Sequence, residues 1–283
     1  MAGPDVLIVD DDEATREGLC QLLALDGFDV GSERDGAKAL ERILTGNIQV
    51  VLLDVLLPGV GGLDVLARCA QDGSSTRIII MTGLDTPEAA LGALRDRAYA
   101  FLSKPIDPPR LLEIVRKALT TVAVRPIEVL SSRPDWVELL VPCTREAADR
   151  IESFLQQLDG DLPADIRESV GLAFRELLLN GIEWGGRLDP SQNVRVSCVR
   201  THRMLLYRIA DPGPGFSLDN LSHAAGADGA SAIAHDQVRQ AQGLRPGGFG
   251  LTMIRAIADE LLYNEQRNEV LFIKYLDEPR QGD

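Results

Sequence analysis

Two polar side chains in the second half of the chain, Glu176 and Asn180, lie four residues apart, so one helix would present both on the same face. The amide oxygen of Asn180 can ligate a Mg²⁺ ion that bridges phosphate groups, and the Glu176 carboxylate can orient or deprotonate an attacking hydroxyl. Taken alone, such a pair is more often a solvated carboxylate beside an ordinary polar helix residue. The residues that accompany the pair therefore decide its interpretation.

Two glycine-rich segments follow the pair. In Asp211-x-Gly213-x-Gly215, a carboxylate at a strand end can accept a hydrogen bond from an adenine amino group, and the glycines let the backbone approach the base. The run Gly247-Gly248-Phe249-Gly250 then opens a helix whose backbone N–H groups can bind phosphate oxygens. The pair and the two segments, in this order, predict a site for ATP and Mg²⁺.

The surrounding residues limit what this site could phosphorylate. Arg245, just before the second glycine run, could meet phosphate charge, although an ordinary surface arginine is an equal interpretation. No histidine lies within twenty residues of Glu176, and His202, His223 and His235 fall in a turn and a loop rather than on helices that could dimerise. The sequence therefore argues against a sensor histidine kinase, and a phosphoryl acceptor would belong to another molecule.

The first half carries a second set of polar residues that could do chemistry. Asp10 and Asp11 follow one apolar run, Asp54 ends another, and Thr82 and Lys104 follow two more. Carboxylates that converge repel one another, so such a site favours a hard cation such as Mg²⁺. A phosphoryl group on Asp54 could pair with the lysine and accept a hydrogen bond from the threonine. Taken singly, these residues could be charge at a helix N-terminus and plain strand ends.

The spacing of apolar residues predicts the elements that position this second set. The runs 6–9, 50–53, 78–81 and 100–102 are nearly continuous, as expected for strands buried on both faces. Helical patterns alternate with them, and repeated strand–helix units form a parallel sheet with helices on both sides. Ligands of such sheets bind at the carboxyl ends of the strands, where the polar residues fall.

The second half predicts a different architecture, an α/β sandwich with helices on one face of a mostly antiparallel sheet. Residues 217–246 are rich in glycine, alanine, serine and aspartate, which predicts a loop or lid. The expected strands cover 136–141, 194–200, 205–210 and 270–275, and the expected helices cover about 145–158, 163–184 and 250–262.

The apolar pattern lapses between the halves. Residues 120–134 contain two prolines and Ser131-Ser132, a composition typical of a linker. We therefore predict domains at residues 1–121 and 135–283, joined by a linker at 122–134.

The composition limits the partners. The net charge of −14 divides evenly, with 19 acidic and 12 basic residues in 1–120 and 24 and 17 in the rest. Neither half has the basic excess that binding to a phosphate backbone requires, so we expect no direct DNA binding. The four cysteines form no CxxC pair, and no apolar run is long enough to span a membrane. We expect a cytoplasmic protein.

Residues 5–120 resemble the receiver domain of bacterial two-component response regulators, through Val9-Asp10-Asp11, Asp54-x-x-x-Pro58, Thr82 and Lys104-Pro105. The resemblance implies a flavodoxin-like, doubly wound sheet of five parallel strands, in which Asp54 accepts a phosphoryl group from a sensor histidine kinase. It also implies that Mg²⁺ is held by Asp10, Asp11, Asp54 and the backbone carbonyl of Leu56, and that Thr82, Phe101 and Lys104 form the switch. Two departures, Leu57 where methionine is usual and Gly61-Gly62 in place of Asp-Gly, remove no chemical group.

The order of motifs in the second half is similar to the ATPase fold shared by gyrase, histidine kinases and mismatch-repair proteins. Residues 175–185 most resemble the anti-sigma-factor serine/threonine kinases, and the similarity covers about residues 126–277. It implies that Asn180 ligates Mg²⁺, Glu176 is the general base and Asp211 binds adenine, while the pocket is shaped by Gly213, Gly215, Gly248 and Gly250.

Two positions depart from that family. Trp184 stands where a histidine is usual, at a packing position. Asn268-Glu269 precedes the last strand in place of Gly-Thr, whose hydroxyl supports adenine binding in the family.

These resemblances predict a response regulator in which phosphorylation of Asp54 controls an ATP-binding serine/threonine kinase acting on an anti-sigma-factor antagonist. One alternative, favoured by Asn268-Glu269, is an ATP-gated module that sequesters a sigma factor or antagonist without catalysis. Another is a receiver that drains phosphate beside a vestigial ATPase fold, which would bind no nucleotide. Related receivers and anti-sigma kinases often dimerise, so a homodimer is compatible with the sequence.

Overall fold

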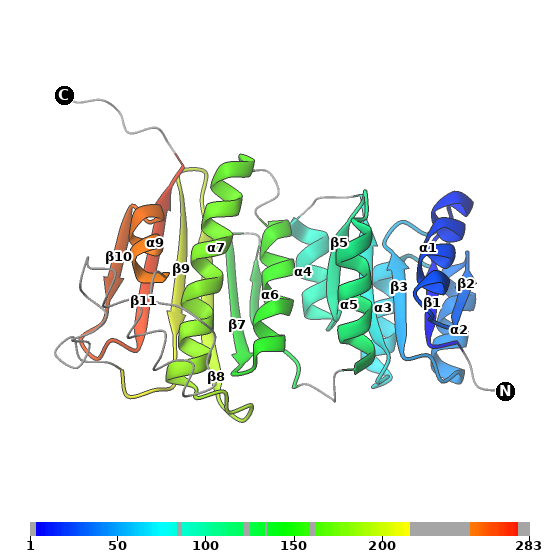
Figure 1. Cartoon of the computed structure of the whole chain (residues 1–283), viewed down its shortest axis with the longest axis horizontal. Helices are drawn as coiled ribbons and strands as arrows, with labels where there is room; N and C mark the ends of the chain where they lie inside the picture. Colours follow the sequence, from blue (N-terminus) through cyan, green and yellow to red (C-terminus); the bar gives the residue numbers. More distant parts are fainter. Residues whose placement is uncertain are drawn as a thin grey trace. The chain divides into compact units, whose positions relative to one another are not determined.

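The structure, a computed structural model, describes residues 4–83, 87–120, 125–133, 135–158, 162–215 and 250–276 (Figure 1). The chain divides into two compact units. Residues 1–124 with 153–161 form the first, and residues 125–152 with 162–283 form the second. Each unit has its own sheet.

The first unit alternates strands and helices, as its apolar runs predict. Its strands form one sheet in the order β2-β1-β3-β4-β5, and every neighbouring pair is parallel. The strands are β1 (Val6–Val9), β2 (Val30–Glu33), β3 (Val50–Asp54), β4 (Arg77–Thr82) and β5 (Ala100–Ser103). The helices are α1 (Glu13–Leu25), α2 (Gly36–Thr45), α3 (Gly62–Gln71), α4 (Pro87–Arg95) and α5 (Pro108–Thr120).

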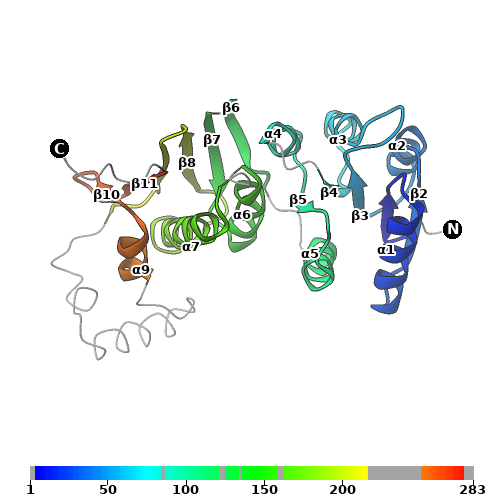
Figure 2. The same ribbon diagram turned by 90° about the horizontal axis from the view of Figure 1, so that it is seen from above.

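Helices cover both faces of this first sheet. Figure 2 shows α1 and α5 on one side and α2, α3 and α4 on the other. The chain places β2 on one side of β1 and then continues with β3 on the other side, so the direction of the strand order reverses between β1 and β3. Open sheets of this kind bind ligands at the carboxyl ends of the strands beside such a point. The predicted flavodoxin-like receiver fold is confirmed.

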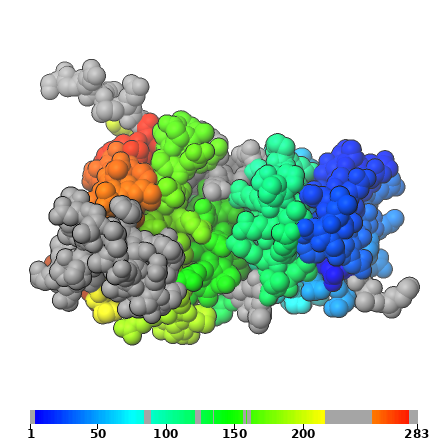
Figure 3. Space-filling view, in the orientation of Figure 1, coloured from blue at the N-terminus to red at the C-terminus, as the bar shows by residue number. Residues whose placement is uncertain are grey.

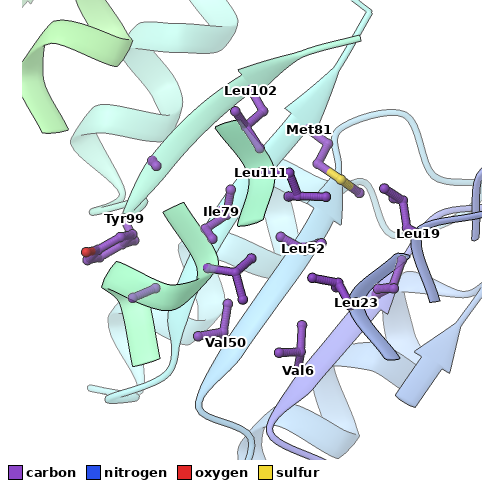
Figure 4. Packing of buried hydrophobic residues seen from close by; sticks show 14 residues of the cluster. Val6, Leu19, Leu23, Val50, Leu52, Ile79, Met81, Tyr99, Leu102 and Leu111 are labelled. Atoms are coloured by element: carbon purple, nitrogen blue, oxygen red, sulfur yellow. The ribbon is translucent and has the colours of Figure 1, made fainter. Parts of the chain in front are cut away.

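A cluster of buried side chains joins the sheet to α1 and α5 (Figure 4). Val50, Leu52 and Ile79 from the central strands are fully buried, and Leu23 of α1 and Leu111 of α5 pack against the same cluster. Burying one such side chain stabilises a fold by about 1.5–3 kcal/mol. The core therefore fixes the strands whose ends carry the polar residues.

The second unit contains an antiparallel sheet in the order β10-β11-β9-β8-β7-β6. Its strands are β6 (Glu128–Arg133), β7 (Trp136–Pro142), β8 (Asn193–Arg200), β9 (Met204–Ala210), β10 (Glu260–Tyr263) and β11 (Glu269–Tyr275). The described helices are α7 (Ala164–Asn180), α9 (Gly250–Ile257) and α6 (Arg145–Leu158), of which residues 145–152 fall in this unit. One turn of π-helix, η1 (Gly181–Gly185), continues α7.

The helices of this unit lie on one face of its sheet, as predicted. Figure 2 shows α6, α7 and α9 on the same side, and Figure 3 shows the side chains of α9, in orange, next to those of α7, in green. Leu205, Tyr207 and Ile209 of β9 are buried on this face, and the rings of Phe174 in α7 and Tyr207 lie 4.9 Å apart. Among the described residues, no helix is long and apolar enough to cross a membrane.

Two expectations about the second half are wrong. Residues 128–133, predicted to lie in the linker, form β6, which pairs with β7. The helix predicted at 250–262 ends at Ile257, and residues 260–263 form β10. Both strands lie at an edge of the sheet and are largely exposed or half-buried, so their apolar alternation is weak.

The core of the first unit can be tested by truncating Leu52, which is fully buried. Leu52→Ala should lower the free energy of unfolding of this unit by about 2–5 kcal/mol, because it leaves a cavity. Leu25→Ala removes the same atoms from a side chain that is 89% exposed, and should cost less than about 0.5 kcal/mol. Amide hydrogen exchange of β1 and β3 in the full chain measures both effects. Equal losses would contradict this core.

Candidate functional site

Three carboxylates meet at the carboxyl ends of β1 and β3. Asp10 and Asp11 directly follow β1, and Asp54 is the last residue of β3. One oxygen of each carboxylate lies within 4.8 Å of the corresponding oxygens of the other two. Asp10 and Asp54 are buried, whereas Asp11 is exposed. Such a set of oxygen ligands suits a hard divalent cation such as Mg²⁺, whose remaining ligands would be water or phosphate oxygens on the exposed side of the site.

Lys104 lies beside two of these carboxylates. Its Nζ is 2.7 Å from Oδ2 of Asp10 and 2.6 Å from Oδ2 of Asp54. Burial by itself would lower the pKa of Lys104, but the hydrogen bonds to Asp10 and Asp54 outweigh it and the pKa is raised. The ammonium group is therefore charged at neutral pH and offsets part of the repulsion between the carboxylates.

Backbone hydrogen bonds join two further residues of the predicted receiver site, Thr82 and Leu56, to this cluster. The N–H of Lys104 donates to the carbonyl of Thr82 over 2.7 Å, which connects the ends of β4 and β5. Thr82 is fully buried and Phe101, within β5, is 1% exposed. The N–H of Leu56 donates to Oδ1 of Asp54 over 3.2 Å. The parts of Thr82, Phe101 and the Leu56 carbonyl in phosphorylation stay predictions.

The segment after Asp54 requires a glycine. A Cβ atom at Gly62 would lie 1.9 Å from the carbonyl oxygen of Asp54, well inside van der Waals contact. Helix α3 can begin against the backbone of Asp54 only because position 62 has no side chain. A Cβ atom at Gly61 would meet nothing closer than 3.5 Å, so Gly62 is the essential member of the pair.

Arg16 also belongs to this site, although it was not among the site residues predicted from the sequence. Its Nη1 donates to the carbonyl of Asp10 over 2.8 Å and to that of Asp11 over 3.2 Å. Asp12 caps α1 by accepting from the N–H of Thr15 over 2.7 Å. Together these bonds tie the first turn of α1 to the carboxylate loop. The spacing of the residues could have predicted this contact. Arg16 lies one turn after Asp12, and side chains in a helix extend toward its N-terminus, where the carbonyls of Asp10 and Asp11 lie.

In the second unit, Glu176 and Asn180 are half-buried near the C-terminal end of α7. A Cβ atom at Gly250 would lie 2.3 Å from Oε1 of Glu176, so the first residue of α9 lies directly against this carboxylate. Helix N-termini carry partial positive charge and bind anions. The carboxylate and the anion-binding end of α9 therefore converge on one place. The predicted residues Arg245 and Gly248 lie outside the described residues.

Asp211, which follows β9, is enclosed by glycines. Its Oδ1 accepts from the N–H of Gly213 over 2.8 Å. A Cβ atom at Gly185 in η1 would lie 2.1 Å from that oxygen, and one at Gly213 would lie 2.8 Å from it. Burial raises the pKa of Asp211, and the hydrogen bond from Gly213 opposes the shift. Within the described part of the chain no group donates to Oδ2, so this oxygen can accept from an amino group of a ligand.

Ion pairs fix the helices around these residues. Arg175 of α7 pairs with Asp149 of α6 over 2.8 Å and also with Glu152. Arg145, at the start of α6, has its Nε 3.1 Å from Oε1 of the buried Glu183 in η1. These contacts hold α6, α7 and η1 together, and so position the backbone that carries Glu176 and Asn180.

His202 and Trp184 lie in exposed positions. His202 is in the turn between β8 and β9, as predicted. Trp184, at the departure from the family pattern, is 40% exposed. His223 and His235 lie outside the described residues.

Two family models match the chain. The response regulator receiver domain matches residues 6–116, and the histidine kinase-like ATPase domain matches residues 140–274. The DNA-binding response regulator MtrA of Mycobacterium tuberculosis is 32% identical over 183 residues, which cover 64% of this chain and 78% of MtrA. The chain belongs to the response regulators. This response regulator joins a receiver domain to a histidine kinase-like ATPase domain.

Further relatives share smaller parts of the response regulator. A cyclic di-GMP phosphodiesterase of Thermotoga maritima is 36% identical over 115 residues, which cover 41% of this chain and 30% of that enzyme. The response regulator thus spans less than a third of that relative's length. The signal receiver domain of an HD domain-containing protein from Pseudomonas fluorescens Pf-5 is 32% identical, with a TM-score of 0.39 over 41% of this chain and 94% of that one.

The carboxylate cluster predicts a Mg²⁺ site that can be tested at its exposed member. Asp11→Asn replaces a carboxylate ligand with a neutral amide and should weaken Mg²⁺ binding about tenfold, or about 1.4 kcal/mol. The matched control is Asp12→Asn, which preserves the cap of α1 because asparagine caps helices as well as aspartate. The Mg²⁺ dependence of the thermal midpoint measures both affinities. Equal losses would mean that surface charge in general, and not the cluster, attracts the ion.

The glycine contact with Asp211 gives a second prediction. Gly185→Ala would push the Asp211 carboxylate out of place, so we expect at least a tenfold loss of ATP affinity, about 1.4 kcal/mol. Gly171→Ala, in α7, introduces a Cβ atom that meets nothing within 4 Å. It should leave the affinity unchanged and stabilise α7 by about 0.5–1 kcal/mol. Titration with a fluorescent ATP analogue compares them, and an unchanged affinity in Gly185→Ala would remove Asp211 from the site.

Proposed function

We propose that a sensor histidine kinase phosphorylates Asp54 of this response regulator, and that the receiver thereby controls a second phosphoryl transfer in the ATPase domain. The observation that carries the second step is the contact between Glu176 and Gly250, which brings a carboxylate to the N-terminus of α9. A base and a phosphate-binding helix end are the two features that transfer of a γ-phosphoryl group requires at one point.

In the receiver, a carboxylate oxygen of Asp54 attacks the phosphorus of a phosphohistidine, the P–N bond breaks, and the imidazole nitrogen leaves with the bonding electrons. A Mg²⁺ ion held by Asp10, Asp11, Asp54 and the Leu56 carbonyl would offset charge on the phosphoryl oxygens. Lys104 contacts the Asp54 carboxylate at 2.6 Å and so pairs with the new phosphoryl group. Thr82 donates its hydroxyl to the same group.

Phosphorylation then changes the bonds of Lys104. Its ammonium group also contacts Asp10, and its backbone N–H bonds to the carbonyl of Thr82. A movement of Lys104 toward a phosphoryl group therefore acts on the ends of β4 and β5, and on Phe101 within β5. This is the two-state element that phosphorylation would bias.

The residues of the second unit fit a purine nucleotide. Oδ2 of Asp211 would accept from the adenine amino group, and this role is supported by the bond from Gly213 to Oδ1 and by the lack of side chains at Gly185 and Gly213. Gly213, Gly215, Gly248 and Gly250 would shape the pocket, Asn180 would hold a Mg²⁺ ion, and Arg245 would meet phosphate charge. That ion would reduce repulsion between the phosphates and an attacking oxygen.

The transfer itself uses Glu176 as general base. The hydroxyl of a serine or threonine on a partner attacks the γ-phosphorus, Glu176 takes the hydroxyl proton, and the bond to the β-phosphate oxygen breaks to release ADP. We propose an anti-sigma-factor antagonist as this partner. The net charge of −14 supports a protein partner rather than direct contact with DNA.

The kinase proposal is tested with the full chain, radiolabelled ATP with Mg²⁺, and an anti-sigma-factor antagonist. Wild type should produce phosphoserine or phosphothreonine on the partner, and Glu176→Gln should lower the rate about 10²–10⁴-fold without the general base. Glu168→Gln is the matched control, because Glu168 is an exposed residue of the same helix; its rate should equal that of wild type.

The same experiment separates the alternatives. ATP binding without transfer in wild type would contradict the kinase and support an ATP-gated module that binds a sigma factor or antagonist. Absence of any nucleotide binding would contradict both, and would leave a receiver beside a vestigial ATPase fold.

A further inference from the structure

The turn between β10 and β11 holds the loop that carries Asp211. The side-chain Nδ2 of Asn268 donates to the carbonyl of Gly213 over 3.1 Å and to that of Asp211 over 3.5 Å. The backbone carbonyl of Asn268 accepts from the N–H of Asp211 over 2.8 Å. One residue therefore binds the loop through both its side chain and its backbone.

A second asparagine orients this side chain. Nδ2 of Asn264 donates to Oδ1 of Asn268 over 2.8 Å, and Oδ1 of Asn264 accepts from the N–H groups of Asn268 and Glu269 over 3.1 and 3.2 Å. Because Oδ1 of Asn268 takes a donor from Asn264, its Nδ2 is directed to the carbonyls of the Asp211 loop.

The backbone of the same turn lies against the end of that loop. A Cβ atom at Gly215, whose φ is +80°, would lie 1.7 Å from the carbonyl oxygen of Gln266. Nε2 of Gln266 donates to the carbonyl of Pro214 over 3.4 Å. The loop is thus supported along its length by residues 264–268.

The side chain of Glu269 takes no part in this support. Its carboxylate forms a bidentate pair with Arg208 of β9, with distances of 2.8 and 2.7 Å. Val270 is buried and pairs with Ile209, whose side chain lies on the face that the helices cover. Neighbouring residues of a strand point to opposite faces. Glu269 therefore points away from the face that carries α7 and α9.

Arg267 has a φ of +58°, in the left-handed region that favours glycine. In the Gly-Thr pair of the family, a glycine is followed by a residue whose side chain donates a hydrogen bond. In this chain, a position that favours glycine is followed by such a donor at Arg267 and Asn268. This is one residue earlier than the position expected from the sequence.

We infer that Arg267-Asn268 occupies the Gly-Thr positions, and that Asn268 is a positioning residue that orients Asp211 toward the amino group of adenine. This inference rests on the proposed binding of ATP. It assigns to the amide of Asn268 the support that a threonine hydroxyl gives in the family. On this inference, the departure at this position preserves the preference for adenine.

The test compares ATP with inosine triphosphate, which carries a carbonyl oxygen in place of the adenine amino group. Wild type should prefer ATP about tenfold, the effect of about one hydrogen bond to a charged group. Asn268→Asp turns the loop-facing donor into an acceptor, so the preference should fall to about twofold or less while inosine triphosphate still binds. Both nucleotides carry the same charge, so the charge added by the substitution cancels in the ratio.

Glu269→Gln is the matched control, because it breaks the pair with Arg208 and should leave the tenfold preference intact. Asn264→Ala keeps Asn268 but frees its amide, and should lower the preference about threefold, which keeps the test decisive if Asn268→Asp does not fold. A full preference in Asn268→Asp or Asn264→Ala, or a loss in Glu269→Gln, would overturn the inference alone. A wild type that binds neither nucleotide would instead overturn the ATP site itself.

Discussion

Repulsion between carboxylates that cannot separate is the constraint on which the receiver depends. Asp10 and Asp54 are buried at the ends of neighbouring parallel strands, with carboxylate oxygens within 4.8 Å. Two such charges repel by about 3 kcal/mol at an effective dielectric constant of about 20. The apolar strands fix their backbones, Arg16 ties the loop to α1, and Gly62 lets α3 begin against Asp54. Lys104 offsets part of the charge, which is why its pKa is raised. A divalent cation and a phosphoryl group would change this balance most strongly.

The ATPase domain also holds a carboxylate at a strand end, that of Asp211. Here the position of the carboxylate is restricted by close packing and not by neighbouring charges. Around Asp211 the constraint is space, because Gly185 and Gly213 leave no room for a Cβ atom, and the turn at residues 264–268 supports the loop from behind. Glu176 is confined in the same way by Gly250. The two candidate sites are therefore built differently, from a cluster of charges in the receiver and from a set of close backbone approaches in the ATPase domain.

Much of this arrangement could be predicted from the sequence. Continuous apolar runs predict the buried strands of the receiver, and Asp10, Asp54 and Lys104 lie together because parallel strand ends meet at one edge. The edge strands β6 and β10 were missed because their exposed side chains give little alternation. The counterpart of the Gly-Thr pair was placed one residue late from the sequence, at Asn268-Glu269. Only the φ of Arg267 and the hydrogen bonds of the folded turn define its register. The contact of Glu176 with Gly250 joins distant segments, and no local pattern encodes it.

The central claim is that the state of Asp54 controls the nucleotide site, and the most direct measurement is the affinity of the full chain for ATP with and without beryllofluoride, a mimic of the phosphoryl group on aspartate. A coupling of about 1–3 kcal/mol would change the dissociation constant about 5–150-fold in wild type. In Asp54→Asn, beryllofluoride should have no effect. Equal ATP affinities in wild type with and without beryllofluoride, at saturating Mg²⁺, would contradict the claim.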